Sequence, residues 1–383
     1  MTIIQERSLL TDGHRLFRDT VSRFFRDEVE PNVKEWEKAG GFPAELFRVA
    51  ARYGLLQAGM PLEYGGMGGD FLHHTILHEG HGFSVGGASI GNGICTDGVS
   101  YLFYAAGTEE QRKEWIPRFA SGEAISEAAF TEPQSGSDVA GTRTYARRDG
   151  SDYVINGSKT WITNGSLCTV FPVLARTEKS SGGSALSVFI VDANAPGVHV
   201  SKPIETAHRG CSIENEIFFQ DVRVPAERLL GGAEGVGFRQ AMGVINNMRV
   251  TEAARFTAAA ELAFDLTTEY VRNRKAFGQP ILSFQNTQFQ LADMKAELAM
   301  LRAYIDQCLA RTLNDTLTPE DSSIAKLMSA EIEFKVMDRC LQLHGGMGYA
   351  NEMPISKLWT LSRVHRIFLG TSEIHRMMIA RSI

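Results

Sequence analysis

The stretch at residues 142–165, TRTYARRDGSDYVINGSKTWITNG, decides the fold class of this 383-residue chain. Its short runs alternate apolar and polar residues, which is the period of a β-strand with one buried face: 142–148, 153–156 and 159–162. Asp149-Gly150 and Asn156-Gly157 join these runs. Both dipeptides are strong hairpin signals, because their residues tolerate the positive φ that tight turns need. The stretch therefore predicts the first strands of an all-β module.

The sequence has a different pattern on either side of this module. Strand-like runs continue as far as DVRVP at 221–225, where the module is expected to end. Residues 9–122 are mainly helical in pattern, with apolar side chains at three- and four-residue spacing from Leu16 to Phe25. After residue 235, long segments rich in Ala, Leu, Glu and Met are typical of an antiparallel bundle: 238–274, 284–314 and 319–344.

The order helical, β, helical predicts an α+β protein. A chain of 383 residues also exceeds the size at which one core usually stops growing. We therefore expect three domains, at 1–123, 124–232 and 233–383.

Composition narrows the class of protein. The apolar content of 43% and charged content of 22% are ordinary for a globular chain, and the net charge of −6 argues against a nucleic-acid surface. No run approaches the roughly 20 apolar residues that cross a bilayer, and residues 1–10 lack the apolar core of a signal peptide. Five scattered cysteines without CxxC spacing indicate a reduced compartment, so a cytoplasmic location is expected: Cys95, Cys168, Cys211, Cys308 and Cys340.

Two polar turns follow predicted strands of the β module. TEPQSGSD at 131–138 is dense in hydroxyls, and WITNG at 161–165 combines an aromatic ring with turn residues. Each is ordinarily a β-turn with polar caps. An isoalloxazine ring also needs this set, in which the indole covers a face and hydroxyls and amides bond the polar edge.

The C-terminal third carries a second pair of motifs. RKAFGQP at 274–280 ends a helix with basic residues, and QLHGGMGY at 342–349 ends another with glycines. Basic residues there complement a helix dipole, and glycines form a C-cap. A pyrophosphate-bearing dinucleotide would use an arginine and a glycine turn in the same way.

Together with PLEYGG at 61–66, DVRVP at 221–225 and RIFLGTSEIHR at 366–376, these motifs resemble the acyl-CoA dehydrogenase family across nearly the whole chain. The resemblance implies an N-terminal helical domain, a central β-barrel-like domain and a C-terminal four-helix bundle. It also implies FAD bound between the last two domains, a homotetramer built as a dimer of dimers, and an electron-transfer flavoprotein as acceptor.

The resemblance assigns roles to individual residues. The flavin ring would be held by Phe130, Thr131, Ser137, Trp161 and Thr163. The ribityl, pyrophosphate and adenine groups would be held by Arg274, Phe277, Gln285, Gln342, Gly345, Gly346, Thr371 and Glu373, some of them across a subunit interface. The pantetheine arm of the substrate would meet Ser137, Asn246, Met248 and Arg249, although the family often has an acid where Asn246 stands.

The family's catalytic glutamate is absent. It removes the substrate's α-proton and usually precedes Gly-Thr-Ser, where this chain has Leu369. The isovaleryl and long-chain types place it on an earlier helix just before an arginine, and that position is Met248. The backbone N–H of Leu369 could still polarise the thioester carbonyl.

Asp97 is the candidate replacement base. It is the only Asp, Glu, Lys or Arg between Gly80 and Thr108, and by resemblance this segment lies against the acyl end of the pocket. A lone carboxylate among apolar residues is expected to have a raised pKa, as such a base requires. Alternatively, Asp97 caps a helix or bonds local amides.

Other acids and histidines are weaker candidates. Glu252 lies one turn after Met248, but an exposed helix glutamate is the commoner interpretation. Glu373 belongs to the flavin signature. Four histidines could suggest a metal, but they lack HExxH spacing, so surface or satisfied side chains are expected and no metal is predicted: His73, His74, His78 and His81.

Three functions remain open from the sequence. The first is an FAD-dependent dehydrogenase of an acyl thioester, carried by CoA or a carrier protein, with unusual substrate or regiochemistry. The second is a non-catalytic partner subunit of an active homologue. The third is a flavin-dependent monooxygenase on the same fold.

Overall fold

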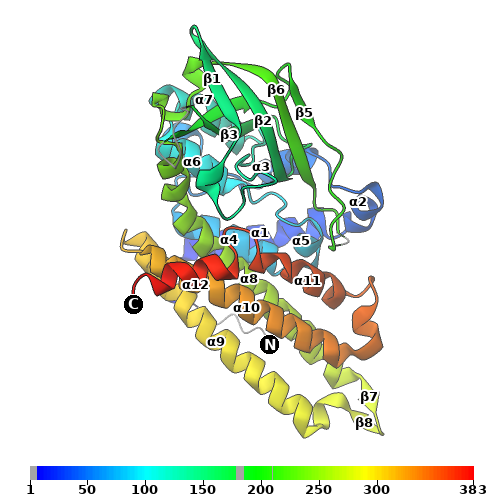
Figure 1. Cartoon of the computed structure of the whole chain (residues 1–383). Helices are drawn as coiled ribbons and strands as arrows, with labels where there is room; N and C mark the ends of the chain where they lie inside the picture. Colours follow the sequence, from blue (N-terminus) through cyan, green and yellow to red (C-terminus); the bar gives the residue numbers. More distant parts are fainter. Residues whose placement is uncertain (1–6, 178–184, 209) are drawn as a thin grey trace.

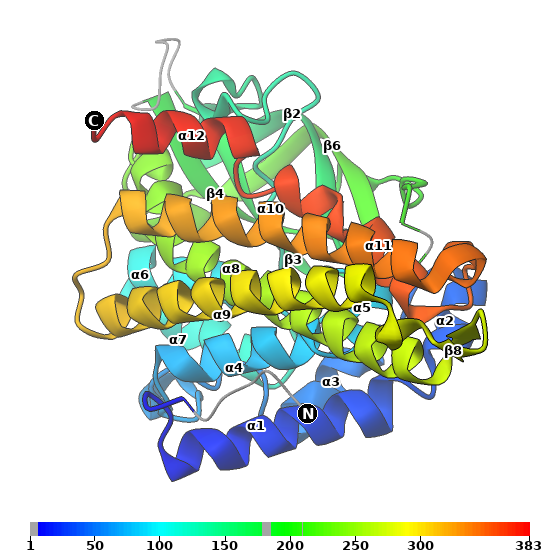
Figure 2. The same ribbon diagram turned by 90° about the horizontal axis from the view of Figure 1, so that it is seen from below.

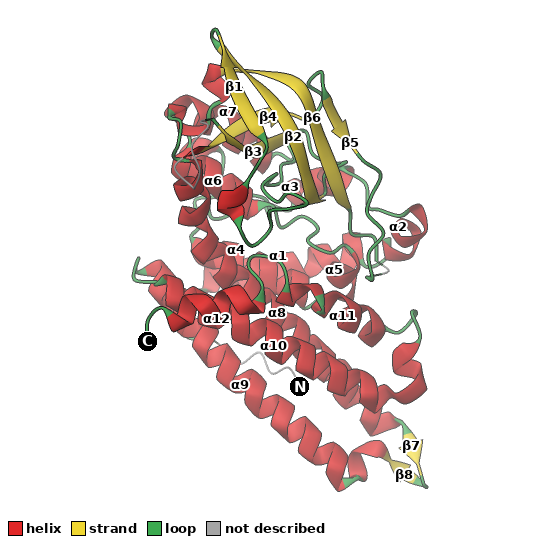
Figure 3. Cartoon of the chain, viewed as in Figure 1, coloured by secondary structure: helices red, strands yellow, loops and turns green. Residues whose placement is uncertain are grey.

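The computed structural model describes residues 7–177, 185–208 and 210–383. Residues 1–6, within the segment where no leader is predicted, lie outside the described part. Figure 1 shows the large sheet at one end of the molecule and most of the long helices at the other. The α+β expectation is confirmed by this arrangement, which Figure 3 colours by element type.

The N-terminal part is helical. Its α-helices are α1 (Asp12–Phe24), α2 (Val33–Ala39), α3 (Glu45–Arg52), α4 (Phe71–Gly82), α5 (Val85–Ser89), α6 (Asp97–Ala106) and α7 (Glu109–Ala120). Helix α1 starts at Thr11, whose hydroxyl accepts from the His14 N–H. Its buried face carries Val21 and Phe24, but Leu16, expected on that face, is 68% exposed. The three- and four-residue spacing predicts an apolar stripe on the helix, but it does not determine which edge of that stripe packs against the core.

The β domain is one six-stranded sheet in the order β4-β3-β1-β2-β6-β5. Its strands are β1 (Tyr145–Asp149), β2 (Asp152–Thr163), β3 (Val170–Arg176), β4 (Leu186–Asp192), β5 (Val198–Val200) and β6 (Glu214–Pro225). The hairpin at Asp149-Gly150 is confirmed, because Asp149 pairs with Asp152 across a two-residue turn.

The hairpin expected at Asn156-Gly157 is wrong. Strand β2 runs straight through both residues, and the register with β6 shifts there. The extra residue lies on β6, where Asp221 adopts φ 49° and its N–H donates to Asn156 Oδ1 at 2.9 Å. The turn chemistry of Asn156-Gly157 therefore serves a β-bulge instead of a turn.

The C-terminal part is dominated by three long helices: α8 (Gly237–Asn273), α9 (Gln285–Leu313) and α10 (Pro319–His344). The short elements are β7 (Lys275–Ala276), β8 (Gln279–Pro280), α11 (Pro354–Ser362) and α12 (Ser372–Ala380). Figure 2 shows α9 and α10 running alongside α8, with α4 and α1 beyond them. The predicted long helices are confirmed to within one residue at each end.

The three parts share one buried core. A single apolar cluster includes Phe24 from α1, Phe171 from β3 and Ala254 from α8. Helix α8 also packs extensively on α4 and α10. This shared packing fixes α4, α6 and α8 relative to the sheet. No helix in the described ranges is long and apolar enough to cross a bilayer.

Candidate active site

A small pocket lies where α4, α6 and α8 meet. Its lining is Phe71, His74, Asp97, Gly98, Tyr101, Val244, Asn247, Met248 and Thr251. Gly98 allows the close approach of α8, since a Cβ on it would lie 2.5 Å from Met248 Cε. Met248 and Asp97 therefore face one cavity. We call this cavity the acyl pocket, after the acyl group that the resemblance predicts beside Asp97.

Asp97 is not a lone carboxylate. It is 8% exposed, and its Oδ1 lies 2.8 Å from His78 Nε2 while its Oδ2 lies 3.2 Å from His74 Nδ1. Burial alone would raise its pKa, but His78 and then His74 outweigh burial and hold the pKa of Asp97 well below its usual range. The expected raised pKa is therefore wrong. Both carboxylate oxygens face α4, although Asp97 is also the first residue of α6.

The contacts of Asp97 continue into a chain of buried charges. His78 Nδ1 lies 3.1 Å from Glu252 Oε1, and Glu252 Oε2 lies 2.5 Å from Arg255 Nη2. Arg255 in turn donates to the Gly91 carbonyl at 3.2 Å. Glu252 is 4% exposed, so the exposed glutamate expected from its helical position is wrong. We call His74, Asp97, His78, Glu252 and Arg255 the charge chain.

Charge alternates along this chain. Burial favours neutral His78, but Asp97 and then Glu252 outweigh burial and raise its pKa to about 9. Burial likewise opposes ionised Glu252, whereas Arg255 and His78 lower its pKa. At neutral pH the chain therefore contains paired ions, with two negative and two positive members.

The histidines of α4 are mostly buried and partnered. His81 accompanies the chain, and its Nε2 lies 2.8 Å from the Gly87 carbonyl oxygen. The sequence predicts surface or satisfied histidines and does not join His74 or His78 to Asp97. Their i, i+4 spacing was the available signal.

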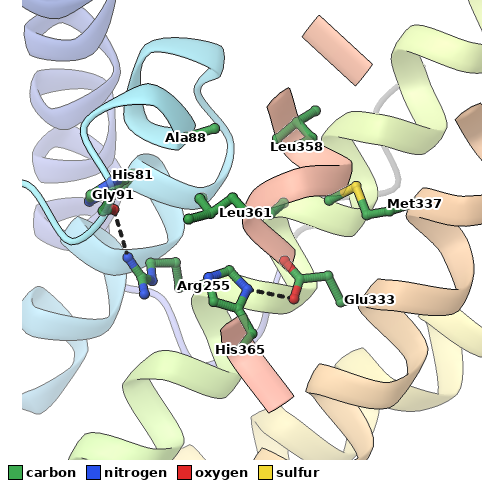
Figure 4. Close-up of a pocket in the computed structure, with 11 residues that line it drawn as sticks. His81, Ala88, Gly91, Arg255, Glu333, Met337, Leu358, Leu361 and His365 are labelled. Carbon is green, nitrogen blue, oxygen red and sulfur yellow. Dashed lines mark hydrogen bonds and ion pairs between the residues drawn. The ribbon is translucent and has the colours of Figure 1, made fainter. Parts of the chain in front are cut away.

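A second small cavity lies further along α8. Figure 4 shows Arg255 reaching Gly91 on one side and Glu333 paired with His365 on the other. Glu333 Oε2 and His365 Nδ1 lie 2.7 Å apart, and both side chains are buried. Burial raises the pKa of Glu333 well above its usual value and lowers the pKa of His365 well below its usual value, so burial favours the neutral form of each. The cavity is lined by none of the residues expected to bind substrate or cofactor.

Leu369 lies in the loop between α11 and α12. It adopts φ 54°, a left-handed conformation that is costly for a leucine. Within the described ranges its N–H donates to no protein acceptor. Lys326 supports this loop, because its Nζ donates to the carbonyls of His365 at 2.6 Å and Gly370 at 3.0 Å. The loop therefore presents a free backbone donor despite the loss of the glutamate side chain.

The remaining substrate candidates lie on α8. Asn246 Oδ1 accepts from Ser322 at 3.1 Å and from Arg249 Nη1 at 3.3 Å. Arg249 is buried, and burial lowers its pKa. Asn246 thus holds Arg249 in the absence of the acid that the family often has there.

Two of the residues expected to hold the flavin ring, Trp161 and Thr163, lie at the C-terminal end of β2. The register of β2 against β6 shifts between Lys159 and Ile162, and Trp161, with φ 59°, is the bulged residue. The bulge turns the indole outward, and Trp161 is 56% exposed. Thr163 ends β2, where its hydroxyl donates to Glu214 at 2.9 Å. Phe130 and Thr131 are half-buried, and Ser137 is exposed.

The dinucleotide candidates of the C-terminal part are separate from these. The β7–β8 turn lies at the end of the bundle away from the sheet (Figures 1 and 3). At this turn Phe277 is 95% exposed with φ 53°. Exposed residues near it or at the end of α10 are Arg274, Gln285, Gln342, Gly345 and Gly346. Thr371 caps α12, which carries the exposed Glu373. Helix α12, the β7–β8 turn and the end of β2 lie apart in Figure 1, so a single chain does not bring all the expected FAD-binding residues together.

Metal ligation is the remaining question. In the described part of the chain, one group has suitable geometry, with ligand atoms of His14, Asp70 and His73 within 4.8 Å of one another. Its members already form the capping boxes of α1 and α4, because each imidazole Nδ1 accepts a backbone N–H, from Thr11 and Asp70 respectively. Capping therefore explains this cluster.

Comparison with known proteins identifies relatives over the full length. Family models described as acyl-CoA dehydrogenase N-terminal, middle and C-terminal domains match residues 11–123, 128–222 and 235–383. The mitochondrial long-chain specific acyl-CoA dehydrogenase of Rattus norvegicus is 38% identical over 100% of this chain and 89% of the relative.

Two solved structures have the same fold. An acyl-CoA dehydrogenase from Geobacillus kaustophilus is 34% identical with a TM-score of 0.95, covering 98% of this chain and 99% of that one. A glutaryl-CoA dehydrogenase from Mycobacterium smegmatis in complex with FADH2 is 30% identical with a TM-score of 0.89, covering 98% and 95%.

Proposed function

Because this chain belongs to the acyl-CoA dehydrogenase family, whose members are FAD-dependent oxidoreductases acting on CH–CH groups, we propose that it oxidises an acyl thioester with Asp97 as proton acceptor. The thioester is carried by CoA or a carrier protein. The reaction is unusual in substrate or regiochemistry, because Leu369 and Met248 fill both of the usual glutamate positions.

The observation that carries this proposal is the position of the Asp97 carboxylate. It lies in the wall of the acyl pocket beside Met248, among the side chains that an acyl group would touch. The wall also carries polar side chains, among them His74, Tyr101 and Thr251. A base here would reach carbons beyond the α position, so desaturation further along the chain or within a ring is favoured.

The histidines shape the chemistry of this base. The charge of His78 keeps Asp97 ionised at physiological pH, so its carboxylate is open to a proton. The same charge lowers the basicity of Asp97. Asp97 Oδ2 lies 3.2 Å from His74 Nδ1, so an unprotonated Nδ1 there would share a proton that arrives at Oδ2. We therefore treat Asp97 and His74 as one acceptor unit.

The chain's residues fit FAD. Trp161 and Phe277 are exposed aromatic side chains held at positive φ, and a planar cofactor would cover them. Cβ atoms built on Gly278, Gly345 and Gly346 meet nothing within 4 Å, so the backbone there is open to a ligand. FAD supplies the hydride acceptor, and the N–H of Leu369 would bond the thioester carbonyl.

The separation of the two candidate groups suggests that each FAD contacts two copies of the chain. Trp161 and Thr163 would hold the ring in one protomer, whereas Arg274, Phe277 and the Gly345 turn would hold the dinucleotide from its partner. A homotetramer built as a dimer of dimers accommodates this. We further propose domain boundaries at 1–123, 124–232 and 233–383, a cytoplasmic location, and an electron-transfer flavoprotein as acceptor.

Anaerobic mixing of the FAD-loaded protein with acyl-CoA probes tests the function. Suitable probes are butyryl-CoA, octanoyl-CoA and cyclohexanecarboxyl-CoA, and the readout is bleaching of the flavin absorbance. A positioned general base contributes about 10²–10⁴-fold in rate. With whichever probe bleaches the wild type, Asp97→Asn should therefore slow bleaching by about that factor while FAD content stays the same.

The control is Asp192→Asn, the same chemical change at an exposed site at the end of β4. It should bleach at the wild-type rate. Unchanged bleaching in Asp97→Asn would remove Asp97 from the mechanism.

Two other functions would give different results. A non-catalytic partner subunit would bleach with no probe alone and would gain activity only with a glutamate-bearing homologue. A flavin-dependent monooxygenase would consume oxygen when supplied with reduced flavin. Turnover of a thioester by the purified single chain would dismiss the partner-subunit function.

A further inference from the structure

A carboxylate that no step above uses lies against the proposed flavin site. Thr163, the last residue of β2, pairs in register with Glu214, the first residue of β6. The Thr163 hydroxyl donates to Glu214 Oε2 at 2.9 Å. Two residues earlier, the bulge turns Trp161 outward on the same strand end. Glu214 is therefore one hydrogen bond away from a residue expected to touch the ring.

We propose that Glu214 takes up a proton when the flavin is reduced and so makes the flavin's reduction potential depend on pH, acting through Thr163. This rests on the FAD site proposed above and concerns the cofactor rather than the acyl substrate. It assigns Glu214 the role of a positioning and redox-tuning residue.

The hydroxyl of Thr163 has one proton, which gives the link its chemistry. While Glu214 is ionised, that proton points to Oε2, so Thr163 can only accept a bond from the ring. Once Glu214 is protonated it can donate to Oγ1, and the Thr163 proton becomes free to point at the ring. Protonation of Glu214 thus changes Thr163 from a hydrogen-bond acceptor into a donor toward the flavin. It also removes a negative charge near the ring.

The surroundings of Glu214 favour titration near neutral pH. Burial raises the pKa of Glu214 to about 7, against the opposing bond from Thr163. In the part of the chain that the structure describes, Glu214 forms no ion pair, so no cation holds it ionised. Glu214 in turn acts on Glu127, on the segment before β1, whose pKa is raised by burial and then by Glu214. Asp97 and Glu252 act on Glu127 in turn.

Two-electron reduction of a bound flavin would add one proton to the ring and, above the pKa of the ring's N1–H, leave it with a negative charge. That charge would raise the pKa of Glu214 further. Between the two pKa values, reduction would then bind a second proton, on Glu214. Below and above this window, only the flavin's own proton would be bound.

The test is a titration of the reduction potential of the FAD-loaded protein against reference dyes from pH 5.5 to 9. One proton per two electrons corresponds to a slope of about 30 mV per pH unit, and two protons double that slope. The wild type should show the doubled slope over a window beginning near pH 7. Glu214→Gln should show the single slope throughout, with a higher potential than the wild type above the window.

Glu216→Gln is the matched control, because it removes a carboxylate from the same face of β6 one pleat further along. It should keep the wild-type slopes. Identical slopes in wild type and Glu214→Gln would overturn the proposal. If Glu214→Gln fails to hold FAD, the reduced-minus-oxidised infrared spectrum of the wild type at pH 7.5 decides: a new protonated-carboxyl band, lost in Thr163→Val, supports the proposal, and its absence overturns it.

The outcome of this titration does not depend on whether Asp97 is the catalytic base. If Asp97→Asn bleached at the wild-type rate, the proposed function of Asp97 would be wrong, but the slopes of reduction potential against pH would be unchanged. Conversely, if the number of protons taken up on reduction did not change with pH, Glu214 would have no role in the reduction potential. The proposed role of Asp97 would be unaffected.

Discussion

The charge chain and the Leu369 loop support the same proposed reaction in opposite ways. The charge chain consists of side chains from α4, α6 and α8 that pair with one another in the core. The Leu369 loop offers no ionisable side chain at the key position, and its contribution is a backbone N–H held at positive φ. The comparison suggests that this chain keeps the family's backbone geometry and moves its acid–base chemistry to another wall.

The largest expected effect on stability comes from breaking the charge chain at Glu252. Glu252→Ala leaves the Arg255 guanidinium buried without its carboxylate partner, and removing one partner of a buried pair costs about 3–5 kcal/mol. Urea unfolding should show this loss. Asp27→Ala, which removes a solvent-exposed pair with Arg26, is the control and should change the midpoint far less. Equal effects of both variants would mean that the chain does not stabilise the core.

His78 should make the stability of this region depend on pH. Its folded pKa of about 9 lies above the unfolded value near 6.5, so its contribution is full below pH 6.5 and is lost as pH rises through 9. The contribution amounts to about 3 kcal/mol. The difference in unfolding free energy between wild type and His78→Gln should therefore be greatest at pH 6 and smallest at pH 9.5. A difference that stays constant over this range would show that His78 is not charged in the folded protein.

A smaller effect is expected in the Leu369 loop, where the contacts are to backbone. Lys326→Met removes the donor shared by the His365 and Gly370 carbonyls. A hydrogen bond to a charged group contributes about 1.5–3 kcal/mol, and no charge is left unpaired here, so a loss of about 2 kcal/mol is expected. Amide hydrogen exchange at 365–371 should also become faster. Lys335→Met, on the exposed face of α10, is the control. Equal exchange rates at 365–371 in both variants would show that Lys326 does not hold the loop in place.

The elements with strong periodicity were predictable from the sequence. The apolar repeats of the three long helices predict their ends to within one residue. Asp149-Gly150 forms the hairpin turn that its residue types favour. Asn156-Gly157 did not, because the same two residues suit a bulge, and only pairing with β6 decides between them. That pairing joins residues more than 60 positions apart.

The environment of Asp97 shows the same limit at the site. The resemblance predicts Asp97 at the acyl end of the substrate site. Its partners are 19 and 23 residues away on α4, and the charge chain continues to Glu252 on α8. A local count of charged residues could not find histidines that arrive through tertiary packing. The sequence therefore singled out the carboxylate but predicted the wrong direction for its pKa.

The left-handed backbone at Leu369 has a consequence for protein engineering. Lys326 holds the loop through the carbonyls of His365 and Gly370, so the shape of the loop does not depend on the side chain at position 369. Leu369→Glu therefore places a carboxylate directly before Gly370 without any rebuilding of the loop. The choice of side chain at this position is then a choice of chemistry alone.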